Sequence, residues 1–254
     1  MYVACLMAGT SSRLLPLTEA DHKAMLRLGK LRIIDLQMRS FALAGIKTFS
    51  IVIGHGGSRL ASHLLKRYSS MALSIINNNH YVDRNLDWSA YLALSSHPGD
   101  VLYYEGDIIA APTLIRQMAT HKGDVCVAVD PVRRSAHVDT IVIGNRDRAR
   151  ELMFAEHGHI PSAIGDRSLG EFVCLVKLSD RARKYVIGRL EEESYRGPMR
   201  LYRIFNDLFA RYRSGVVSTA GYPWVEIDTK GDLSRARRLV QQVLGDTPAN
   251  PSIR

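Results

Sequence analysis

Short apolar runs alternate with helix-like segments through the first half of the chain, and this alternation restricts the fold more than any other feature. The runs with strand character are Tyr2–Met7, Phe49–Ile53, Leu73–Ile76, Val101–Tyr104 and Val125–Val129. The segments with helical character are Arg32–Ala44, Arg59–Tyr68, Leu86–Ser95 and Thr113–His121. Apolar strands joined by helices form parallel sheets that are covered on both faces. We therefore predict an α/β fold with a Rossmann-like mixed, mostly parallel sheet flanked by helices.

The second half follows a less regular pattern, with polar interruptions between residues 133 and 169. Further strands are expected at Thr140–Ile143, Glu171–Leu178 and Val216–Ala220, and helices at Asp180–Glu193, Met199–Tyr212 and Asp232–Leu244. This pattern predicts a single domain over residues 1–245 with a smaller lobe around 133–220. The polar residues 246–254 are expected to form a flexible tail.

The charge of the chain favours anionic ligands. Its 254 residues carry a formal charge of +9, but the basic residues are dispersed and form no ladder with aromatic side chains. Nucleic acid is therefore not an expected partner. No stretch is apolar and long enough to cross a bilayer, so a membrane is not expected either. The first strand lacks the features of a signal peptide, which favours a cytoplasmic location.

The three cysteines offer no metal site. Cys5, Cys126 and Cys174 are far apart in the chain, and each lies in an apolar run. Because no pair has the spacing of metal ligands, we expect buried free thiols.

A glycine-containing loop follows the first strand and carries the first candidate chemistry. Ala8-Gly9-Thr10-Ser11-Ser12 leads into Arg13, and Lys23 follows ten residues later. Loops at the carboxyl ends of parallel strands bind ligands, and consecutive backbone amides can surround a phosphate chain. The two cations would neutralise charge on a phosphoryl group during transfer. An ordinary polar turn is the alternative interpretation of this loop.

Carboxylates end two other apolar segments. Gly106-Asp107 follows the strand Val101–Tyr104, and Glu226-Ile227-Asp228 follows Trp224 late in the chain. With strand alternation, Glu226 and Asp228 face the same side, where the two charges repel each other unless a cation lies between them. Hard cations such as magnesium prefer these oxygen ligands. The alternatives are a helix-capping role for Asp107 and a solvated strand edge for the pair.

Taken in order, these motifs resemble the nucleoside-triphosphate transferase family of the sugar-nucleotide pyrophosphorylase type. The resemblance comprises the opening loop with Arg13-Leu14, Pro16-Leu17-Thr18 and Lys23, followed by Ala44-Gly45-Ile46, Gly106-Asp107 and Glu226-Ile227-Asp228. It covers nearly the whole chain. It implies the glycosyltransferase-A-like fold of nucleotidyltransferases, and an enzyme that moves a nucleoside monophosphate from a triphosphate to a small anionic acceptor.

Three local stretches resemble the small branch that makes CDP-choline and CMP-phosphonates. These stretches are Asn79-His80-Tyr81 with Asn85 and Ser89, Gly170-Glu171-Phe172-Val173, and Trp224-Val225-Glu226-Ile227-Asp228-Thr229. This similarity implies CTP as donor. The acceptor would be 2-aminoethylphosphonate, hydroxyethylphosphonate or a molecule like phosphocholine. Transfer of CMP to it would release pyrophosphate. The smaller lobe would bind the acceptor. The protein is also expected to form a homodimer.

The resemblance also implies roles for individual residues. The catalytic residues would be Arg13, Lys23 and Asp107, and Mg²⁺ would be held by Asp107, Glu226 and Asp228. The nucleotide-binding residues would be Ala8, Gly9, Thr10, Ser11, Ser12, Arg13 and Gly106. The acceptor-binding residues would be Asn85, Ser89, Tyr81, Glu171 and Trp224.

The sequence departs from the family pattern at several positions and leaves two other functions open. Met7 replaces a small residue, Ser11 and Ser12 stand where many members have glycine, and His22 replaces the proline before the lysine. Leu86 interrupts a common pair of asparagines. One alternative is a sugar-1-phosphate nucleotidyltransferase that uses UTP or dTTP. The other is a nucleotide-binding regulatory protein of the same fold without catalytic activity.

Overall fold

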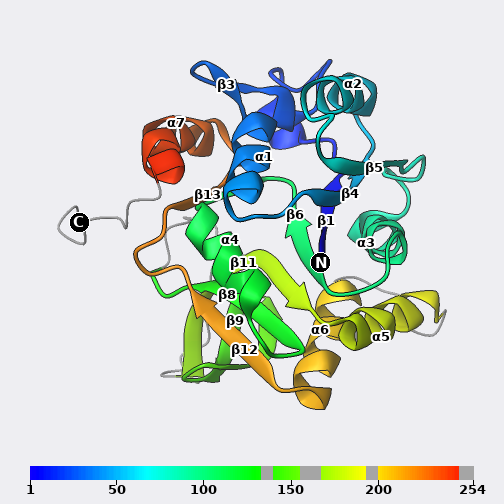
Figure 1. The fold of residues 1–254 in the computed structure, drawn as a ribbon, viewed down its shortest axis with the longest axis vertical. Coiled ribbons are helices and arrows are strands. Elements are labelled where there is room, and N and C mark those ends of the chain that lie inside the picture. Colours follow the sequence, from blue (N-terminus) through cyan, green and yellow to red (C-terminus); the bar gives the residue numbers. More distant parts are fainter. Residues whose placement is uncertain (133–139, 155–166, 193–199, 246–254) are drawn as a thin grey trace.

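The fold is built around one large mixed sheet with helices on both faces (Figure 1). The structure, a computed structural model, describes residues 1–132, 140–154, 167–192 and 200–245. Within them the sheet has nine strands in the order β5-β4-β1-β6-β11-β8-β12-β10-β9. The predicted tail at 246–254 lies outside the described residues. No helix in these ranges is both long and apolar enough to span a membrane.

The first half of the chain supplies the parallel part of the sheet, as predicted. Its strands are β5 (Ala72–Asn77), β4 (Thr48–Ile53), β1 (Tyr2–Met7) and β6 (Val101–Glu105). All neighbours among them pair in parallel. Every residue of β1 is buried, because strands lie on both of its edges and helices on both faces of the sheet.

The second half introduces reversed strands. It contributes β11 (Ser168–Leu178), β8 (Val125–Asp130), β12 (Ser214–Ser218), β10 (Arg148–Phe154) and β9 (Thr140–Asn145). β11 runs antiparallel to β6 and β8, and β10 runs antiparallel to β12 and β9. Of the nine strands described, the other seven therefore point in one direction. This agrees with a mixed, mostly parallel sheet, in which both reversed strands, β10 and β11, come from the second half.

Two small sheets were not predicted from the sequence. β7 (Ile108–Ala110) pairs with β13 (Trp224–Glu226), and β2 (Arg27–Leu28) pairs with β3 (Leu31–Arg32). Their strands have only two or three residues, which is too short for a periodic pattern. The β7–β13 pair matters for the site, because it attaches a late segment of the chain beside the end of β6.

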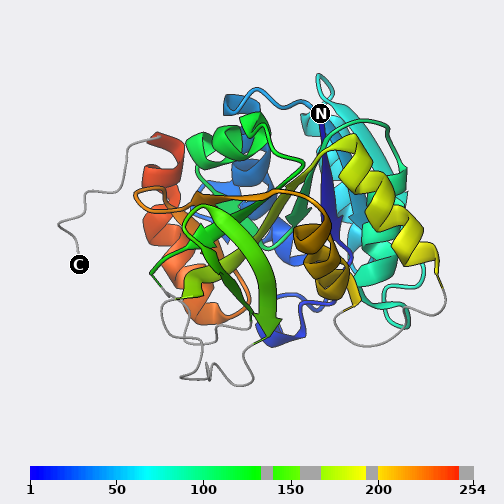
Figure 2. The same cartoon turned by 90° about the horizontal axis from the view of Figure 1, so that it is seen from below.

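Helices cover both faces of the large sheet (Figures 1 and 2). One core cluster contains side chains of α3 (Asn85–Ser95), α5 (Asp180–Glu191) and α6 (Arg200–Arg211). The opposite cluster contains side chains of α1 (Ile33–Leu43), α2 (Gly57–Arg67) and α4 (Pro112–Thr120). α7 (Lys230–Gly245) packs against α1 through a third cluster. Two short 3-10 turns, Ser12–Leu14 and Lys23–Met25, lie in the segment after β1.

The helix boundaries follow local signals that the sequence contains. Pro112 occupies the first turn of α4, where a missing backbone N–H costs nothing. α1 ends before Gly45, which has φ of 88° and lets the chain reverse direction as predicted. The three cysteines are free thiols: Cys5 and Cys126 are buried, and Cys174 is half-buried with φ of 44° where the β11 register shifts.

The region expected to form a smaller lobe supplies strands β9, β10, β11 and β12 and helices α5 and α6. Those strands belong to the same sheet as β1, and α5 and α6 share a core with α3. This continuity places the second half of the sheet directly beside the carboxyl ends of β1 and β6.

Candidate active site

A cavity of about 330 Å³ opens at the carboxyl ends of β1 and β6. Its walls are formed by β1 and the loop after it, by α3 and by the end of β6. The lining residues are Leu6, Met7, Ala8, Gly9, Thr10, Ser11, Ser12, Arg13, Leu14, His22, Lys23, Tyr81, Leu86, Ser89, Glu105, Gly106, Asp107 and Asp228. The seven residues predicted to bind the nucleotide are all among them.

The loop after β1 presents main chain to this cavity. Ser11 adopts a left-handed conformation with φ of 54°, and its carbonyl accepts bonds from the Leu14 N–H and from the Thr18 hydroxyl. A Cβ at Gly9 would meet no atom within 4 Å. The protein itself therefore does not require glycine there, and the bare main chain leaves room for a ligand to approach closely.

The turn after β6 is held tightly against β1. The Gly106 N–H donates to the Leu6 carbonyl at 2.9 Å, and a Cβ at Gly106 would lie 2.4 Å from Cγ of Met7. The buried Gln37 amide of α1 donates to the carbonyls of Gly106 and Ile108. These contacts require glycine at position 106 and fix the direction in which the next residue, Asp107, leaves the strand.

Lys23 lies at the base of the cavity and bridges two aspartates. It is 8% exposed, and its Nζ lies 3.1 Å from both Oδ2 of Asp107 and Oδ1 of Asp228. The same ammonium donates to the Ile227 carbonyl at 2.9 Å. Burial acts to lower the pKa of Lys23, but the two carboxylates outweigh burial and the pKa is raised. The lysine therefore carries a fixed positive charge.

Arg13 supplies a second cation at the rim of the cavity. Its guanidinium lies 2.9 Å from Oδ2 of Asp228, while 62% of its side chain is exposed. Such an exposed pair contributes little to stability, so the guanidinium can turn toward an anion that enters the cavity.

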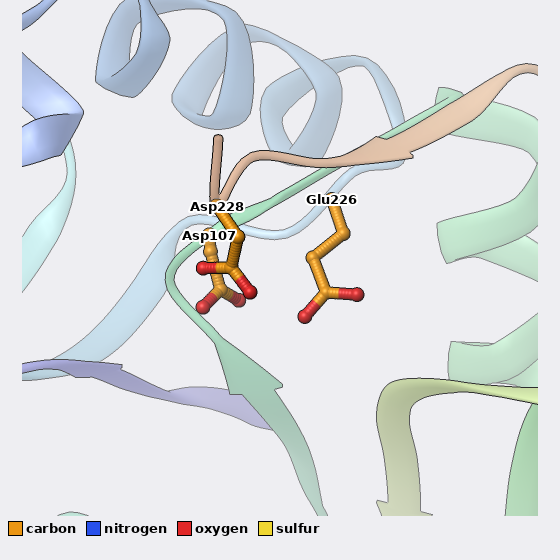
Figure 3. Close-up of side chains that lie close together, drawn as sticks. All are labelled: Asp107, Glu226 and Asp228. Atoms are coloured by element: carbon orange, nitrogen blue, oxygen red, sulfur yellow. The ribbon is translucent and has the colours of Figure 1, made fainter. Parts of the chain in front are cut away.

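Three carboxylates predicted as metal ligands lie together (Figure 3). Asp107, Glu226 and Asp228 each offer an oxygen, and these oxygens lie within 4.8 Å of one another. The β7–β13 pairing and the bond from the Ile227 N–H to the Asp107 carbonyl bring the two segments side by side. Figure 3 shows the three side chains projecting in the same direction from neighbouring strand ends.

The charges within this cluster are incompletely balanced. Oδ1 of Asp107 is buried and has no hydrogen-bond partner among the described residues. Burial, followed by the charges of Asp107, Asp228 and Glu105, raises the pKa of Glu226 to about 9. A divalent cation would supply both the missing partner and the missing positive charge, so the donor set fits such an ion.

Glu105 also lines the cavity; it belongs to the segment Glu105-Gly106-Asp107 at the end of β6, but no role was predicted for it. Burial, then the charge of Asp107, raises the pKa of its carboxyl to about 7. The hydroxyls of Tyr103 and Tyr202 both donate to its Oε1. One signal was available in the sequence: Glu105 lies two residues from Asp107, and side chains alternate along a strand.

Two of the predicted acceptor-binding residues form part of the cavity wall on the α3 side. Ser89 is 4% exposed and accepts a bond from the Asn78 amide at 2.9 Å. Tyr81 packs so closely over Gly54 that a Cβ there would lie 2.8 Å from the Tyr81 ring. Asn85 is the first residue of α3, and its side chain lies outside what the structure describes.

The other two predicted acceptor-binding residues are not brought to the wall of this cavity. Trp224 is 5% exposed, and its indole N–H donates to Oδ2 of Asp130 at 2.6 Å. Glu171 is 4% exposed and lies on β11, where its backbone pairs with Asp130 of β8. Any contribution of these two side chains to acceptor binding would act through the residues that surround them.

Comparisons with known proteins agree with this architecture. A family model described as nucleotidyl transferase matches residues 3–152. No curated protein matches the chain in a sequence search. Among solved structures, an inositol-1-phosphate CTP transferase from T. maritima has 16% identity and a TM-score of 0.75, with 95% of each chain covered.

Two other similar structures have different substrates in their names. The CTP:phosphocholine cytidylyltransferase from Streptococcus pneumoniae has 16% identity and a TM-score of 0.74, with 94% of this chain and 98% of that chain covered. A UDP-glucose pyrophosphorylase has 13% identity and a TM-score of 0.73, with 95% and 99% covered. At these identities the likeness establishes the fold.

Proposed function

The chain belongs to the nucleotidyl transferase family, and from this premise we propose that it transfers CMP from CTP to a small phosphonate or phosphate acceptor and releases pyrophosphate. Nucleotidyl transfer to a sugar or phosphate acceptor is the activity of the family. The proposal concerns three properties: CTP as the donor, the chemical identity of the acceptor and a cytoplasmic location.

The Lys23 bridge is the observation that carries this proposal. It places one buried cation against two carboxylates, beside a loop whose main chain lines the same cavity. Transfer of a nucleotidyl group is limited chiefly by negative charge that accumulates around the α-phosphorus. A site made of cations and metal-binding carboxylates suits that problem, whereas a nucleophilic triad would not.

We assign Mg²⁺ to Asp107, Glu226 and Asp228. Two observations support this assignment: Oδ1 of Asp107 has no hydrogen-bond partner among the described residues, and the three carboxylates lie close to one another. Carboxylate oxygens are the ligands that magnesium prefers, and phosphate oxygens of the substrate commonly complete its coordination. When bound, the ion would neutralise charge on the triphosphate.

The protein's own residues would then orient and stabilise the reacting groups. The main chain of Gly9–Ser12 would hold the triphosphate, and Lys23 and Arg13 would stabilise the α-phosphate and the departing pyrophosphate. An acceptor oxygen would attack the α-phosphorus in line with the leaving group. Because a phosphonate or phosphate is already an anion near neutral pH, the reaction needs no strong general base. Holding both substrates in one cavity supplies much of the rate.

Two kinds of support favour the cytidylyl branch over other donors. The stretches around Tyr81, Glu171 and Trp224 resemble that branch, and Tyr81 and Ser89 line the cavity. Two of the similar structures are CTP-dependent enzymes by name. The similarity to a UDP-glucose pyrophosphorylase supports the second candidate, a sugar-1-phosphate nucleotidyltransferase that uses UTP or dTTP.

The decisive experiment measures pyrophosphate release for each pairing of donor and acceptor in the presence of magnesium. The donors are CTP, UTP, ATP, GTP and dTTP, and the acceptors are phosphocholine, 2-aminoethylphosphonate, 2-hydroxyethylphosphonate and glucose-1-phosphate. We expect release with CTP and a phosphonate or phosphocholine, and loss of release when the metal is chelated. Release confined to glucose-1-phosphate with UTP or dTTP would instead establish the second candidate.

A further inference from the structure

Glu105 lies in the wall of the active-site cavity, and neither the transfer step nor the metal site as proposed uses it. The residue ends β6, which lies between β1 and β11 at the centre of the sheet. Its side chain is half-buried and lines the cavity together with Asp107 and Ser89. A ligand in the cavity would therefore meet this carboxylate.

Two tyrosines fix the orientation of the carboxylate. The hydroxyls of Tyr103 and Tyr202 donate to the same oxygen, Oε1 of Glu105, at 2.7 and 3.3 Å. Tyr103 is fully buried, and the ring of Tyr202 packs edge-on against Phe172. Oε2 accepts no hydrogen bond from any described residue. Glu105 is thus held by one oxygen, and its other oxygen is left for a donor that the protein does not supply.

Among the described residues Glu105 forms no ion pair with a basic side chain, in contrast to its neighbours. Asp107 pairs with Lys23, and Asp228 pairs with both Lys23 and Arg13. In the described part of the chain, no lysine, arginine or histidine lies within ion-pair distance of Glu105. An unpaired, partly desolvated carboxylate is costly, and a cation beside it would interact strongly because the surrounding dielectric is low.

We propose that Glu105 is a specificity-determining residue that binds a primary ammonium group on the acceptor. The geometry suits this group, because an ammonium supplies both the positive charge and the N–H donor that Oε2 lacks. The acceptor class is therefore an aminoalkyl phosphonate or phosphate, preferred over the corresponding hydroxyl compound. The inference rests on the proposed function for the reaction, and it limits the preferred acceptors to compounds that carry a primary amine.

The test compares acceptors that differ only in the charged group. With CTP and magnesium, kcat and KM are measured for 2-aminoethylphosphonate and 2-hydroxyethylphosphonate, for the wild type and for Glu105→Gln. We expect the wild type to prefer the amine. Glutamine keeps the size and the tyrosine bonds of the side chain, so Glu105→Gln is expected to reduce that preference about tenfold or more, mainly through KM for the amine.

Two further variants separate recognition from general damage. Glu191→Gln removes the same charge from an exposed glutamate of α5 that also accepts a tyrosine hydroxyl, from Tyr91 at 3.0 Å; it should leave the preference unchanged. Tyr202→Phe removes one bond that positions Glu105 and should reduce the preference by a smaller factor. This second variant keeps the test decisive if Glu105→Gln does not fold.

Equal losses for both acceptors in Glu105→Gln would overturn the inference, because they would mean that Glu105 acts on the nucleotide or the metal site. Phosphocholine is measured as a third acceptor, and a change in Glu105→Gln that is confined to phosphocholine would also overturn the inference, since a quaternary ammonium has no N–H to donate. If the wild type uses only sugar phosphates, the proposed function fails by itself. Glucosamine-1-phosphate and glucose-1-phosphate then provide the same amine-to-hydroxyl comparison, and an unchanged preference in Glu105→Gln would overturn the role of Glu105.

Discussion

The two aspartates and the two glutamates at the candidate site balance their charge in different ways. Asp107 and Asp228 share Lys23, and Arg13 adds a further pair to Asp228. Within the described residues Glu105 and Glu226 form no ion pair with a basic side chain, and burial raises the pKa of these carboxyls to about 7 and about 9. The aspartate pair is thus organised before any ligand arrives. The glutamate pair retains a demand for positive charge that a metal ion and an acceptor can meet.

Removing Asp107 should have the largest effect, because this residue belongs to the organised pair and also offers an oxygen to a metal. We expect Asp107→Asn to lower kcat by about 1,000-fold or more, since it removes a metal-binding charge while keeping the volume of the side chain. Pyrophosphate release measures the effect, and thermal unfolding tests the fold. Asp147→Asn, at an exposed aspartate that does not line the cavity, is the control. Wild-type turnover in Asp107→Asn would disprove the metal assignment.

Lys23→Ala would break the aspartate pair from its other side. It removes the cation that joins Asp107 to Asp228, and we expect kcat to fall by about 100-fold, the typical cost of losing one preorganised charge stabiliser. Single-turnover kinetics with saturating substrates isolate the chemical step. Lys30→Ala, at an exposed lysine on the same segment, should change kcat less than twofold or so. If kcat falls equally in both variants, the bridge from Lys23 to Asp107 and Asp228 has no special role in transfer.

Trp224→Phe tests whether Trp224 supports acceptor binding indirectly, through its buried hydrogen bond to Asp130. The substitution deletes the donor to the Asp130 carboxylate, and we expect unfolding to become easier by about 2–3 kcal/mol, the cost of a lost bond to a charged group. Urea unfolding gives this value. A raised acceptor KM without any loss of stability would instead indicate direct contact with the acceptor.

We expect the free energy of unfolding to depend on pH through His22, which lines the cavity next to Lys23. Burial, then the charge of Lys23, lowers the pKa of His22 from 6.5 to about 4. The unfolded chain therefore binds the proton more readily. The contribution of His22 to stability is complete above pH 6.5 and is lost as the pH falls toward 4.

This linkage predicts that stability falls by about 2 kcal/mol between pH 7.5 and pH 5 through His22 alone. His22→Asn keeps an acceptor for the Ala24 N–H that Nδ1 now binds. The variant should therefore lose less stability than the wild type over this range of pH, as measured by urea unfolding. Parallel curves for the two proteins would contradict the assignment.

Sequence patterns predicted the fold best where local signals were strong. The buried strands β1, β4, β6 and β8 are continuous apolar runs, and each was recognised from its own residues. The family and the α/β architecture are confirmed. β10 escaped prediction because Arg148, Arg150 and Glu151 interrupt its apolar residues. β7 was not predicted because it has only three residues, and the strand expected over Glu226-Ile227-Asp228 ends at Glu226 in β13.

Residues of the candidate site could be predicted where they belong to short sequence motifs. The loop Ala8–Arg13, Lys23 and the three carboxylates proposed as metal ligands were predicted from motifs, and the fold brings them together. Glu105 was not chosen, because its significance comes from Tyr202, which is 97 positions away. The buried state of Trp224 depends on Asp130, which is 94 positions away. No local pattern contains such contacts.

The Lys23 bridge also determines when the enzyme becomes competent during its synthesis. Lys23 is separated from Asp107 by 84 positions and from Asp228 by 205. A nascent chain therefore exposes the Ala8–Arg13 loop and Lys23 long before the last carboxylates emerge from the ribosome. The site can assemble only once β13 has paired with β7, so incomplete chains should have no nucleotidyl transfer activity to release into the cell.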